Sequence, residues 1–472
     1  MRKRFQWWLC CAGLALWAGA ALAQEPAEVE EEEQAQEEAQ EPQTPQTVEE
    51  RLDELDQRLR VLDRKTELEK EQAAEKAKTA GTATASAKDG FSLRSADNAF
   101  VLRLRGYVQF DGRFFQDDVQ RPATDTFLLR RVRPILEGTL YKNFDFRIMP
   151  DFGGGTTVLQ DAYLDARVSP RFRIRAGKYK PPVGLERLQS GTDILFAERA
   201  LPTNLVPNRD LGIQLHGDLP GGVNYAVGVF NGVPDLGIAD SDTNGGKDVA
   251  ARVFFTPFAA GNGPFKNLGL GIAASQGSQE GTPTATGLPS YRTPAQQTFF
   301  SYRADGTAAG TAVADGDRTR ISPQGYFYRG PFGLMAEYVQ SSQEVVRGAV
   351  AEELEHDAWQ VSTSWVLAGG GEPSYRAVNP KKPFDLEAKT WGAFEIAARY
   401  SVLDLDEATF PVFANPASSA RSAEAWAVGL NWYLSRNLRL YLDYEQTEFE
   451  GGAATGDRED EKILFSRFQV SF

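Results

Sequence analysis

The sequence predicts an all-β fold: a transmembrane antiparallel β-barrel of about 16 strands, preceded by a short N-terminal coiled-coil helix. Three observations lead to this prediction. Apolar and polar residues alternate from about residue 99 onward, the turns and loops differ greatly in length, and the last strand ends on an aromatic residue. Because barrel strands hide their lipid-facing residues by alternation, a mean hydropathy of -0.40 is compatible with a membrane protein.

The alternation is clearest in the last strand. One face is mostly apolar and carries Leu464, Ser466, Phe468, Val470 and Phe472. The other face is mostly polar and carries Phe465, Arg467, Gln469 and Ser471. Bacterial outer-membrane barrels resemble this arrangement, with lipid on one side of the strand and water on the other. The resemblance implies that the barrel-assembly machinery is a partner and reads the terminal Phe472.

The loop lengths indicate the number of strands. Eight long loops are expected, at 115–125, 182–209, 233–248, 276–318, 342–356, 369–389, 404–422 and 446–460. Eight long loops that alternate with short turns imply about sixteen antiparallel strands. The last strand then runs toward the short-turn side, which places the C-terminus in the periplasm. A soluble β-sandwich or propeller also alternates, but it would not need an export signal, a terminal Phe472 and such unequal loops together.

The N-terminus has the pattern of a signal peptide over residues 1–23. Basic residues at 2–4 precede an apolar core, and Ala21-Leu22-Ala23 forms a small-residue cleavage site. Cys10 and Cys11 both lie in that core, so the mature chain is expected to contain no disulfide and no thiolate metal site. The expected location is the outer membrane of a Gram-negative cell, with the N-terminal extension in the periplasm.

Three further segments separate the signal peptide from the barrel. Residues 24–47 are rich in Glu, Gln, Pro and Ala and predict an acidic disordered linker. Residues 48–76 predict a coiled coil, because apolar residues recur in a heptad pattern at Val48, Leu52, Leu55, Leu59 and Leu62. A single amphipathic helix is the alternative interpretation. Residues 77–98 are expected to be a hinge, and residues 99–472 the outer-membrane β-barrel.

Basic residues are concentrated in the first strands of the predicted barrel. Residues 100–216 contain 18 Lys and Arg against 13 Asp and Glu, although the whole chain has a net charge of -14. The alternation places a basic stripe on the lumen face at Arg103, Arg105, Arg113, Arg173 and Arg175. Guanidinium groups in a narrow passage attract anions, and their planar fork suits phosphate and carboxylate. The other interpretation is that these arginines only satisfy lumen carboxylates.

Several motifs together resemble the family of phosphate-selective porins O and P. They are Gly106-Tyr107-Val108-Gln109-Phe110-Asp111, Phe127-Leu128-Leu129-Arg130-Arg131, Gly177-Lys178-Tyr179-Lys180-Pro181-Pro182-Val183-Gly184-Leu185-Glu186-Arg187 and Gly429-Leu430-Asn431-Trp432-Tyr433. The likeness extends over residues 91–472. It implies a homotrimer of sixteen-stranded barrels, each narrowed by an inward-folded loop, that takes up anions by passive diffusion.

The resemblance also implies the residues of a pore constriction. Arg130 and Arg131 match the paired arginines of the family, Arg187 stands in place of a phosphate-binding lysine, and Ser190 matches one of its small hydroxyl residues. With the inward-facing Arg133 and the acidic match Asp161, the predicted constriction comprises Arg130, Arg131, Arg133, Arg187, Ser190 and Asp161. The alternation gives Arg130 outward parity, so it lies either above the lipid or at a bulge that turns it inward. The hydroxyl expected after Ser190 is replaced by Gly191.

Motifs of enzymes are missing from the sequence. His216 and His356 are isolated, no nucleophile–base pair is apparent, and His356 is expected in a solvated loop. No cofactor, no specific metal site and no nucleic-acid partner are predicted. The expected function is that of an outer-membrane porin for small anions of the phosphate or pyrophosphate type, in contact with lipopolysaccharide. The alternative is a structural outer-membrane protein whose coiled coil tethers the barrel to periplasmic partners.

Overall fold

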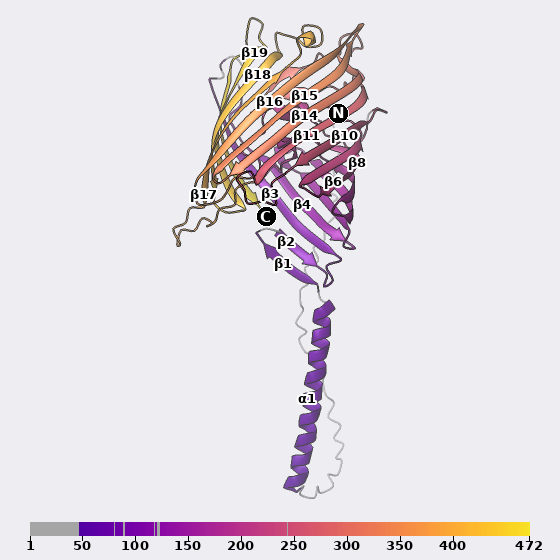
Figure 1. Cartoon of the computed structure of the whole chain (residues 1–472), viewed down its shortest axis with the longest axis vertical. Helices are drawn as coiled ribbons and strands as arrows, with labels where there is room; N and C mark the ends of the chain where they lie inside the picture. The colour runs from indigo at the N-terminus through magenta and orange to yellow at the C-terminus, as the bar shows by residue number, and fades with distance from the viewer. Residues whose placement is uncertain (1–46, 80, 88–89, 118, 120–122, 243) are drawn as a thin grey trace, which may run out of the picture. The chain divides into compact units, whose positions relative to one another are not determined.

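The computed structural model describes residues 47–79, 81–87, 90–117, 119, 123–242 and 244–472 (Figure 1). The predicted signal peptide and nearly all of the acidic linker lie outside these residues. The chain divides at residue 74 into two compact units. None of the described helices has the length and apolar character needed to cross a membrane.

The helix α1 spans Val48–Thr79 and therefore includes the range predicted to form a coiled coil. Its start is a capping box, because the backbone N–H of Thr47 donates to the Glu50 carboxylate at 2.9 Å and the Glu50 N–H donates back to the Thr47 hydroxyl at 3.4 Å. Leu55 and Leu59 on the heptad seam are each 57% exposed in the single chain. The helix is thus confirmed, while its association into a coiled coil stays a prediction.

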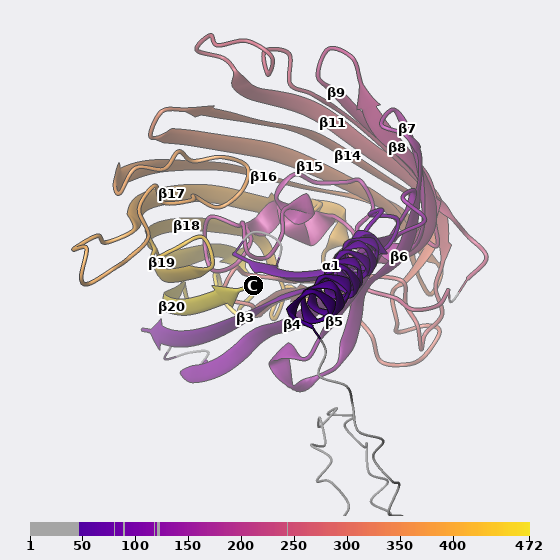
Figure 2. The ribbon, with the colours of Figure 1, turned by 90° about the horizontal axis from the view of Figure 1, so that it is seen from below.

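The barrel contains the sixteen strands that the sequence predicts. The sheet has 18 strands, of which β1 and β2 form a hairpin at one edge and the other sixteen form the barrel. These sixteen are β3 (Val101–Gln116), β4 (Thr126–Leu140), β5 (Phe144–Asp151), β6 (Val158–Ser169), β7 (Phe172–Tyr179), β8 (Asp210–Leu219), β9 (Val223–Phe230), β10 (Asp248–Phe255), β11 (Asn267–Glu280), β14 (Val313–Arg329), β15 (Phe332–Arg347), β16 (Val350–Ala368), β17 (Ala393–Asp404), β18 (Ala420–Tyr433), β19 (Leu438–Gly451) and β20 (Glu461–Ser471). Strands that are consecutive in this series pair antiparallel, and β20 pairs with β3 to close the barrel (Figure 2).

The connections differ from the predicted loops in three places. Residues 342–356, expected as a loop, belong mainly to β15 and β16, which are joined by a two-residue turn. The connection 369–392 is long but leaves the end of the barrel where β20 terminates, here called the C-terminal end. A connection at 152–157 was missed at the opposite end, here called the loop end. The strand number is correct because the missed connection compensates for the misplaced one.

The range predicted as a hinge contains a β-hairpin. Its strands β1 (Thr82–Ser86) and β2 (Gly90–Arg94) pair antiparallel, and β2 pairs with the first four residues of β3. This hairpin lies on the same edge of β3 that β20 uses farther along, where Ser471 pairs with Tyr107. The sequence of β1 does not predict a strand, because its Thr, Ala and Ser residues show no alternation of large apolar and polar side chains. All of these side chains are exposed.

A large hydrophobic cluster lies inside the lumen and includes wall residues of β7, β9 and β10 as well as of β15–β19. The short 3₁₀ helix η3 (Leu201–Leu205) belongs to the connection 180–209, and its Leu201 and Leu205 are fully buried. They pack in one cluster with inward-facing wall residues that include Ala358, Leu403 and Ala423. Because alanine is small, the alanine positions on the wall leave room for η3 inside the lumen. This part of the lumen is therefore filled with protein.

Candidate functional site

The connection 180–209 between β7 and β8 folds into the lumen. Glu337 on β15 accepts the backbone N–H of Leu185 at 2.6 Å, and Asp443 on β19 accepts that of Ala197 at 2.7 Å. A buried backbone N–H needs a partner, and these two wall carboxylates supply it. The inward-folded loop that the family resemblance implies is therefore present, and it is hydrogen-bonded to strands β15 and β19.

Arginines of the same wall bind the carbonyl groups of this loop. Arg439 donates to the carbonyl oxygens of Ile194 and Leu195 at 3.0 and 2.9 Å, and Arg399 donates to that of Glu198 at 2.8 Å. Bonds from a charged donor are roughly twice as strong as those between neutral groups. The loop is held by these contacts, which fix the direction of the Glu198 side chain.

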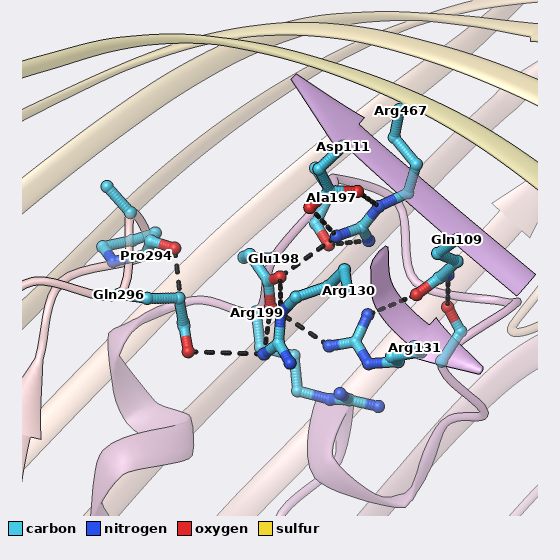
Figure 3. A network of polar contacts seen from close by, with 12 residues as sticks. Gln109, Asp111, Arg130, Arg131, Ala197, Glu198, Arg199, Pro294, Gln296 and Arg467 are labelled. Carbon is cyan, nitrogen blue, oxygen red and sulfur yellow. Dashed lines mark hydrogen bonds and ion pairs between the residues drawn. The ribbon is translucent and has the colours of Figure 1, made fainter. Parts of the chain in front are cut away.

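A β-bulge brings two adjacent arginines to the same side of β4. Gln109 pairs with Arg131 and Phe110 with Leu129, so Arg130 has no partner in the β3–β4 register. A bulge of this kind re-aims a side chain. Arg130 and Arg131 consequently both point into the lumen, toward the loop 180–209 (Figure 3). Of the two possibilities left open for Arg130, the bulge is confirmed.

Glu198 lies at the centre of four arginines. Its carboxylate accepts from Arg130 Nε at 2.5 Å and from Arg131 Nη2 at 3.1 Å, and also from Arg113 at 3.2 Å and Arg467 at 3.0 Å (Figure 3). Burial by itself would raise the pKa of the Glu198 carboxyl. The four guanidinium groups outweigh this effect, so that the pKa lies well below its usual value and the group is ionised at neutral pH.

A second carboxylate neutralises part of this cluster. Asp111 accepts from Arg467 Nε and Nη2 at 2.6 and 2.7 Å, and from Arg113 at 3.3 Å. The cluster of Arg113, Arg130, Arg131 and Arg467 therefore contains four positive charges against the two negative charges of Asp111 and Glu198. A net positive charge of two remains in a buried polar environment, where electrostatic interactions are stronger than in water.

A cavity of about 430 Å³ opens above this cluster toward the loop end. Its lining comes from the connection 180–209, from the connections that follow β9 and β11, and from the bulge in β4. The charged residues in the lining are Arg130, Arg131, Arg187, Arg199, Arg292, Glu198 and Asp235. Five arginines thus face two carboxylates, and Asp235 is already bound to Arg320 at 2.6 Å.

Two arginines of the lining bind backbone carbonyl groups. Arg199 donates to the carbonyl oxygens of Glu186 at 3.1 Å and Gln189 at 2.8 Å, and Arg187 donates to that of Thr203 at 2.9 Å. Within the described residues neither guanidinium is in a salt bridge, and the buried Nε of Arg187 has no hydrogen-bond partner. Their positive charges are therefore available to an anion in the cavity.

Lys180 adds a further basic group at the start of the connection. Its Nζ donates to the carbonyl oxygen of Gln189 at 2.6 Å. Removal from water lowers the pKa of the Lys180 ammonium well below its ordinary value, and the positive charges of Arg209 and Arg199 lower it further. An anion that enters this region would favour the charged form of the lysine.

Arg133 and Asp161, both predicted in the constriction, form separate ion pairs beside the cavity. Arg133 donates to Asp151 at 2.7 Å, and Asp161 lies within 3.4 Å of Arg209 and 3.6 Å of Arg147. Neither residue lines the cavity that contains the two bulge arginines.

Ser190 also lies outside that cavity, and the structure explains the glycine after it. The Ser190 hydroxyl bonds to that of Thr192 at 2.9 Å. A Cβ atom at Gly191 would lie 2.9 Å from the phenol oxygen of Tyr107 and 3.5 Å from Cδ of Arg131. A hydroxyl side chain at this position would therefore require the Tyr107 phenol to shift.

The predicted basic stripe divides into two groups. Arg113 joins the cluster around Glu198, whereas the others lie nearer the C-terminal end. A second cavity of about 470 Å³ is lined there by Arg103, Arg173 and Arg175. Asp165 accepts from Arg173 at 3.0 Å and from Arg175 at 2.7 Å. Arg105 pairs with Glu137 at 3.2 Å.

Glu198 and Arg199 were not predicted as site residues. They are adjacent charged residues that directly follow the apolar run Ile194–Ala197. This change from apolar to charged residues is the one feature of the sequence that could have pointed to them. The pattern does not show where a loop side chain points. Arg467 was placed on the polar face of the last strand, but its contact with the loop could not be foreseen.

The connection 369–392 enters the lumen from the C-terminal end. The Tyr375 hydroxyl donates to the carbonyl oxygen of Leu185 at 2.6 Å, and its ring stacks on that of Tyr326 at 5.3 Å. Gln189 donates to the Tyr375 carbonyl at 2.9 Å. The segment around Tyr375 therefore supports the loop 180–209 from the side opposite the arginine cavity.

Replacing Tyr375 by alanine is expected to increase the single-channel conductance, because it removes both the ring and the bond to Leu185 that fill this part of the lumen. Single-channel recordings in KCl would measure the change. The Tyr375→Phe variant keeps the ring and should remain close to the wild type. A conductance that is equal in the wild type and in Tyr375→Ala would show that the segment does not narrow the pore.

Both histidines are bonded in the interior. His216 Nε2 lies 3.0 Å from Asp165, and His356 Nε2 lies 2.8 Å from the Tyr302 hydroxyl. His356 is 2% exposed, so the expectation of a solvated loop residue was wrong. Among the residues that the structure describes, no group of three or more His, Cys, Asp or Glu has the arrangement of a metal site.

Comparisons with known proteins bear on the family and on the fold of the chain. Residues 101–472 match the family model described as phosphate-selective porin O and P. The outer-membrane channel DcaP of Acinetobacter baumannii has a similar fold, with a TM-score of 0.51 and 12% identity over 79% of this chain and 98% of that one. The trimer form of Vibrio cholerae OmpT gives a TM-score of 0.49 and 11% identity over 79% and 100%. No curated protein matches the sequence. The family match covers the whole barrel and exceeds half of the chain, so this protein belongs to the phosphate-selective porin O and P family.

Proposed function

We propose that the protein is an outer-membrane porin through which small anions diffuse passively. The observation that carries this proposal is the cavity at the loop end, where five arginines face two carboxylates, and Asp235, one of the two, is paired with Arg320 outside the lining. The arginine-lined second cavity lies nearer the C-terminal end. An anion that leaves the first cavity would therefore meet further guanidinium groups along the lumen.

The solutes that fit this lining best are phosphate and pyrophosphate-type anions. The guanidinium groups of Arg130, Arg131, Arg187 and Arg199 can donate to several oxygens of one tetrahedral anion. Arg187 provides a planar fork where the family has a lysine, and this difference favours anions with two neighbouring oxygens. The sites are formed by side chains on a wall strand and a bonded loop, so little reorganisation is needed on binding.

The test is a bilayer recording on the wild-type protein. Under a KCl gradient the reversal potential should have the sign of chloride permeation, and inorganic phosphate or pyrophosphate should block the conductance. A preference for cations that neither anion affects would refute the proposal. Because surface charges are screened by salt, the selectivity should be measured at low and at high KCl concentration.

The proposal includes an arrangement in the membrane. The C-terminal end of the barrel faces the periplasm, where the N-terminal extension also lies, and the loop end faces lipopolysaccharide. Phe472 is proposed as the residue that the barrel-assembly machinery reads. The assembly is proposed to be a homotrimer. Three barrels would then present three separate arginine cavities.

A second candidate function is a structural tether, and one observation favours it. The apolar seam of α1 is exposed in the single chain, with Leu55 and Leu59 each 57% accessible. Such a seam is normally covered by other helices, either of the same protein or of a periplasmic partner.

Deletion of residues 24–79 tests the tether and keeps the β1–β2 hairpin intact. If the tether is the main function, cells with this deletion should lose envelope integrity, measured as detergent sensitivity, while the purified pore conducts normally. Replacing Leu55 and Leu59 by aspartate should have the same effect if the seam is the contact. Normal detergent resistance in both variants would exclude the tether.

A further inference from the structure

Glu198 has an unusual position for a lumen carboxylate, because it is itself part of the anion-binding lining. Its side chain reaches the cavity at the loop end and accepts from Arg130 through both Nε, at 2.5 Å, and Nη2, at 3.2 Å. This two-point contact is the geometry with which an arginine fork binds a carboxylate or phosphate. Figure 3 shows Glu198 between Arg130, Arg131 and Arg467. The carboxylate therefore occupies the place that a solute anion would take.

The ion pairs around Glu198 are divided unequally among the arginines. Within the described residues, Arg130 and Arg131 form salt bridges with Glu198 and with no other carboxylate. Arg467 is also bound to Asp111 at 2.6 Å, and Arg113 is bound to Asp111 at 3.3 Å. If a solute anion took the first two arginines, Glu198 could keep its contacts with the other two. An exchange of partners would thus leave no buried charge unpaired.

Both arginines line the cavity, and Arg130 is the more accessible of the two. The Arg130 side chain is 26% exposed, whereas those of Arg131 and Glu198 are 4% and 2% exposed. Arg199 and Arg187 lie in the same lining and form no salt bridge within the part of the chain that the structure describes. They provide a first contact for the incoming anion. The anion can therefore arrive next to the Glu198 carboxylate before it displaces it.

From this geometry we propose that Glu198 is a tethered competitor that sets the affinity of the pore for anions. This inference rests on the proposed function and names the residue that limits binding at that site. A solute anion binds Arg130 and Arg131 by displacing the Glu198 carboxylate, so binding is weaker than the number of arginines would suggest. Weak binding is what permits flux, because an ion must also leave the site.

The test compares the block by inorganic phosphate in the wild type and in Glu198→Gln. Glutamine has nearly the same shape but no negative charge, so the half-blocking phosphate concentration should fall about tenfold, a factor that corresponds to about 1.4 kcal/mol. The matched control is Glu395→Gln, which removes another buried lumen carboxylate that accepts from Tyr433 at 2.6 Å away from the arginine cluster. This control should leave the half-blocking concentration unchanged. An equal or weaker block in Glu198→Gln, or an equal gain in the control, would overturn the inference.

A second measurement keeps the inference testable if Glu198→Gln forms few channels. In the purified Glu198→Ala variant, inorganic phosphate can fill the vacated position and bind the four arginines. Phosphate should then raise the unfolding temperature of Glu198→Ala more than that of the wild type, since a ligand stabilises the state that it binds. Equal shifts would contradict the inference. The wild-type reversal potential tests the proposed function separately: an anion-selective wild type with no gain of block in Glu198→Gln refutes only the role of Glu198.

Discussion

Replacing both Arg130 and Arg131 by alanine is expected to weaken the block by inorganic phosphate more than a hundredfold. Each arginine can supply a charge-assisted hydrogen bond to the anion, and such bonds contribute about 1.5–3 kcal/mol each. The loss of both therefore amounts to about 3–6 kcal/mol, and every 1.4 kcal/mol is about a factor of ten in affinity. The measurement is the half-blocking phosphate concentration in single-channel recordings, and the reversal potential should move toward cations in parallel.

The fold should survive this double substitution, because Glu198 keeps its contacts with Arg113 and Arg467. A matched control removes two arginines elsewhere: Arg421, which pairs with Glu407 at 2.6 Å, and the exposed Arg436. The control changes the net charge equally and should leave the phosphate block as it is. If both double variants lose block to the same degree, the effect comes from the overall charge and the cavity is not the binding site.

Replacing Asp111 by alanine is expected to destabilise the barrel by about 3–5 kcal/mol, the usual cost of leaving one partner of a buried ion pair alone. Asp111 on β3 and Arg467 on β20 are both fully buried and joined by bonds of 2.6 and 2.7 Å across the seam that closes the barrel. Without Asp111, Arg467 would share Glu198 with three other arginines. Denaturant unfolding of the purified protein in detergent, followed by tryptophan fluorescence, would measure the loss.

The same seam provides a control for this prediction. Lys462 on β20 pairs with Asp117, just after β3, at 3.0 Å, but the Asp117 side chain is 76% exposed. Exposed ion pairs contribute little, so Asp117→Ala should unfold at nearly the same denaturant concentration as the wild type. Equal midpoints for Asp111→Ala and Asp117→Ala would mean that the buried pair does not stabilise the seam.

The sequence was sufficient to predict the barrel, because the alternation of apolar and polar residues can be recognised within each strand. A period of two is a property of each strand, and Phe472 and the unequal loops indicate closure in a membrane. The prediction is wrong where strands continue beyond the apolar band, because residues 342–356, predicted as a loop, lie mainly in β15 and β16. Nor could alternation tell that the long connection 369–392 belongs to the C-terminal end.

The candidate site was predictable in part. Alternation places Arg131 on the lumen face, the family resemblance implies Arg187, and both residues line the cavity. Arg130 stands at a position where the alternation expects a lipid-facing side chain, so a bulge could be considered from the sequence. The partner of these arginines could not be identified, because Glu198 comes from a loop whose path depends on wall contacts such as those of Glu337 and Asp443.

The edge of β3 that closes the barrel holds two strands end to end. β2 pairs with residues 101–104, β20 pairs with residues 107–116, and a Cβ at Gly90 would lie 3.3 Å from the carbonyl carbon of Phe472. The hairpin thus occupies the part of this edge that lies beyond the last strand. A slip by one residue would exchange lipid-facing and lumen-facing side chains, and a slip by two toward β2 would collide with Gly90. The position of the hairpin along β3 therefore limits how far the last strand can shift toward β2.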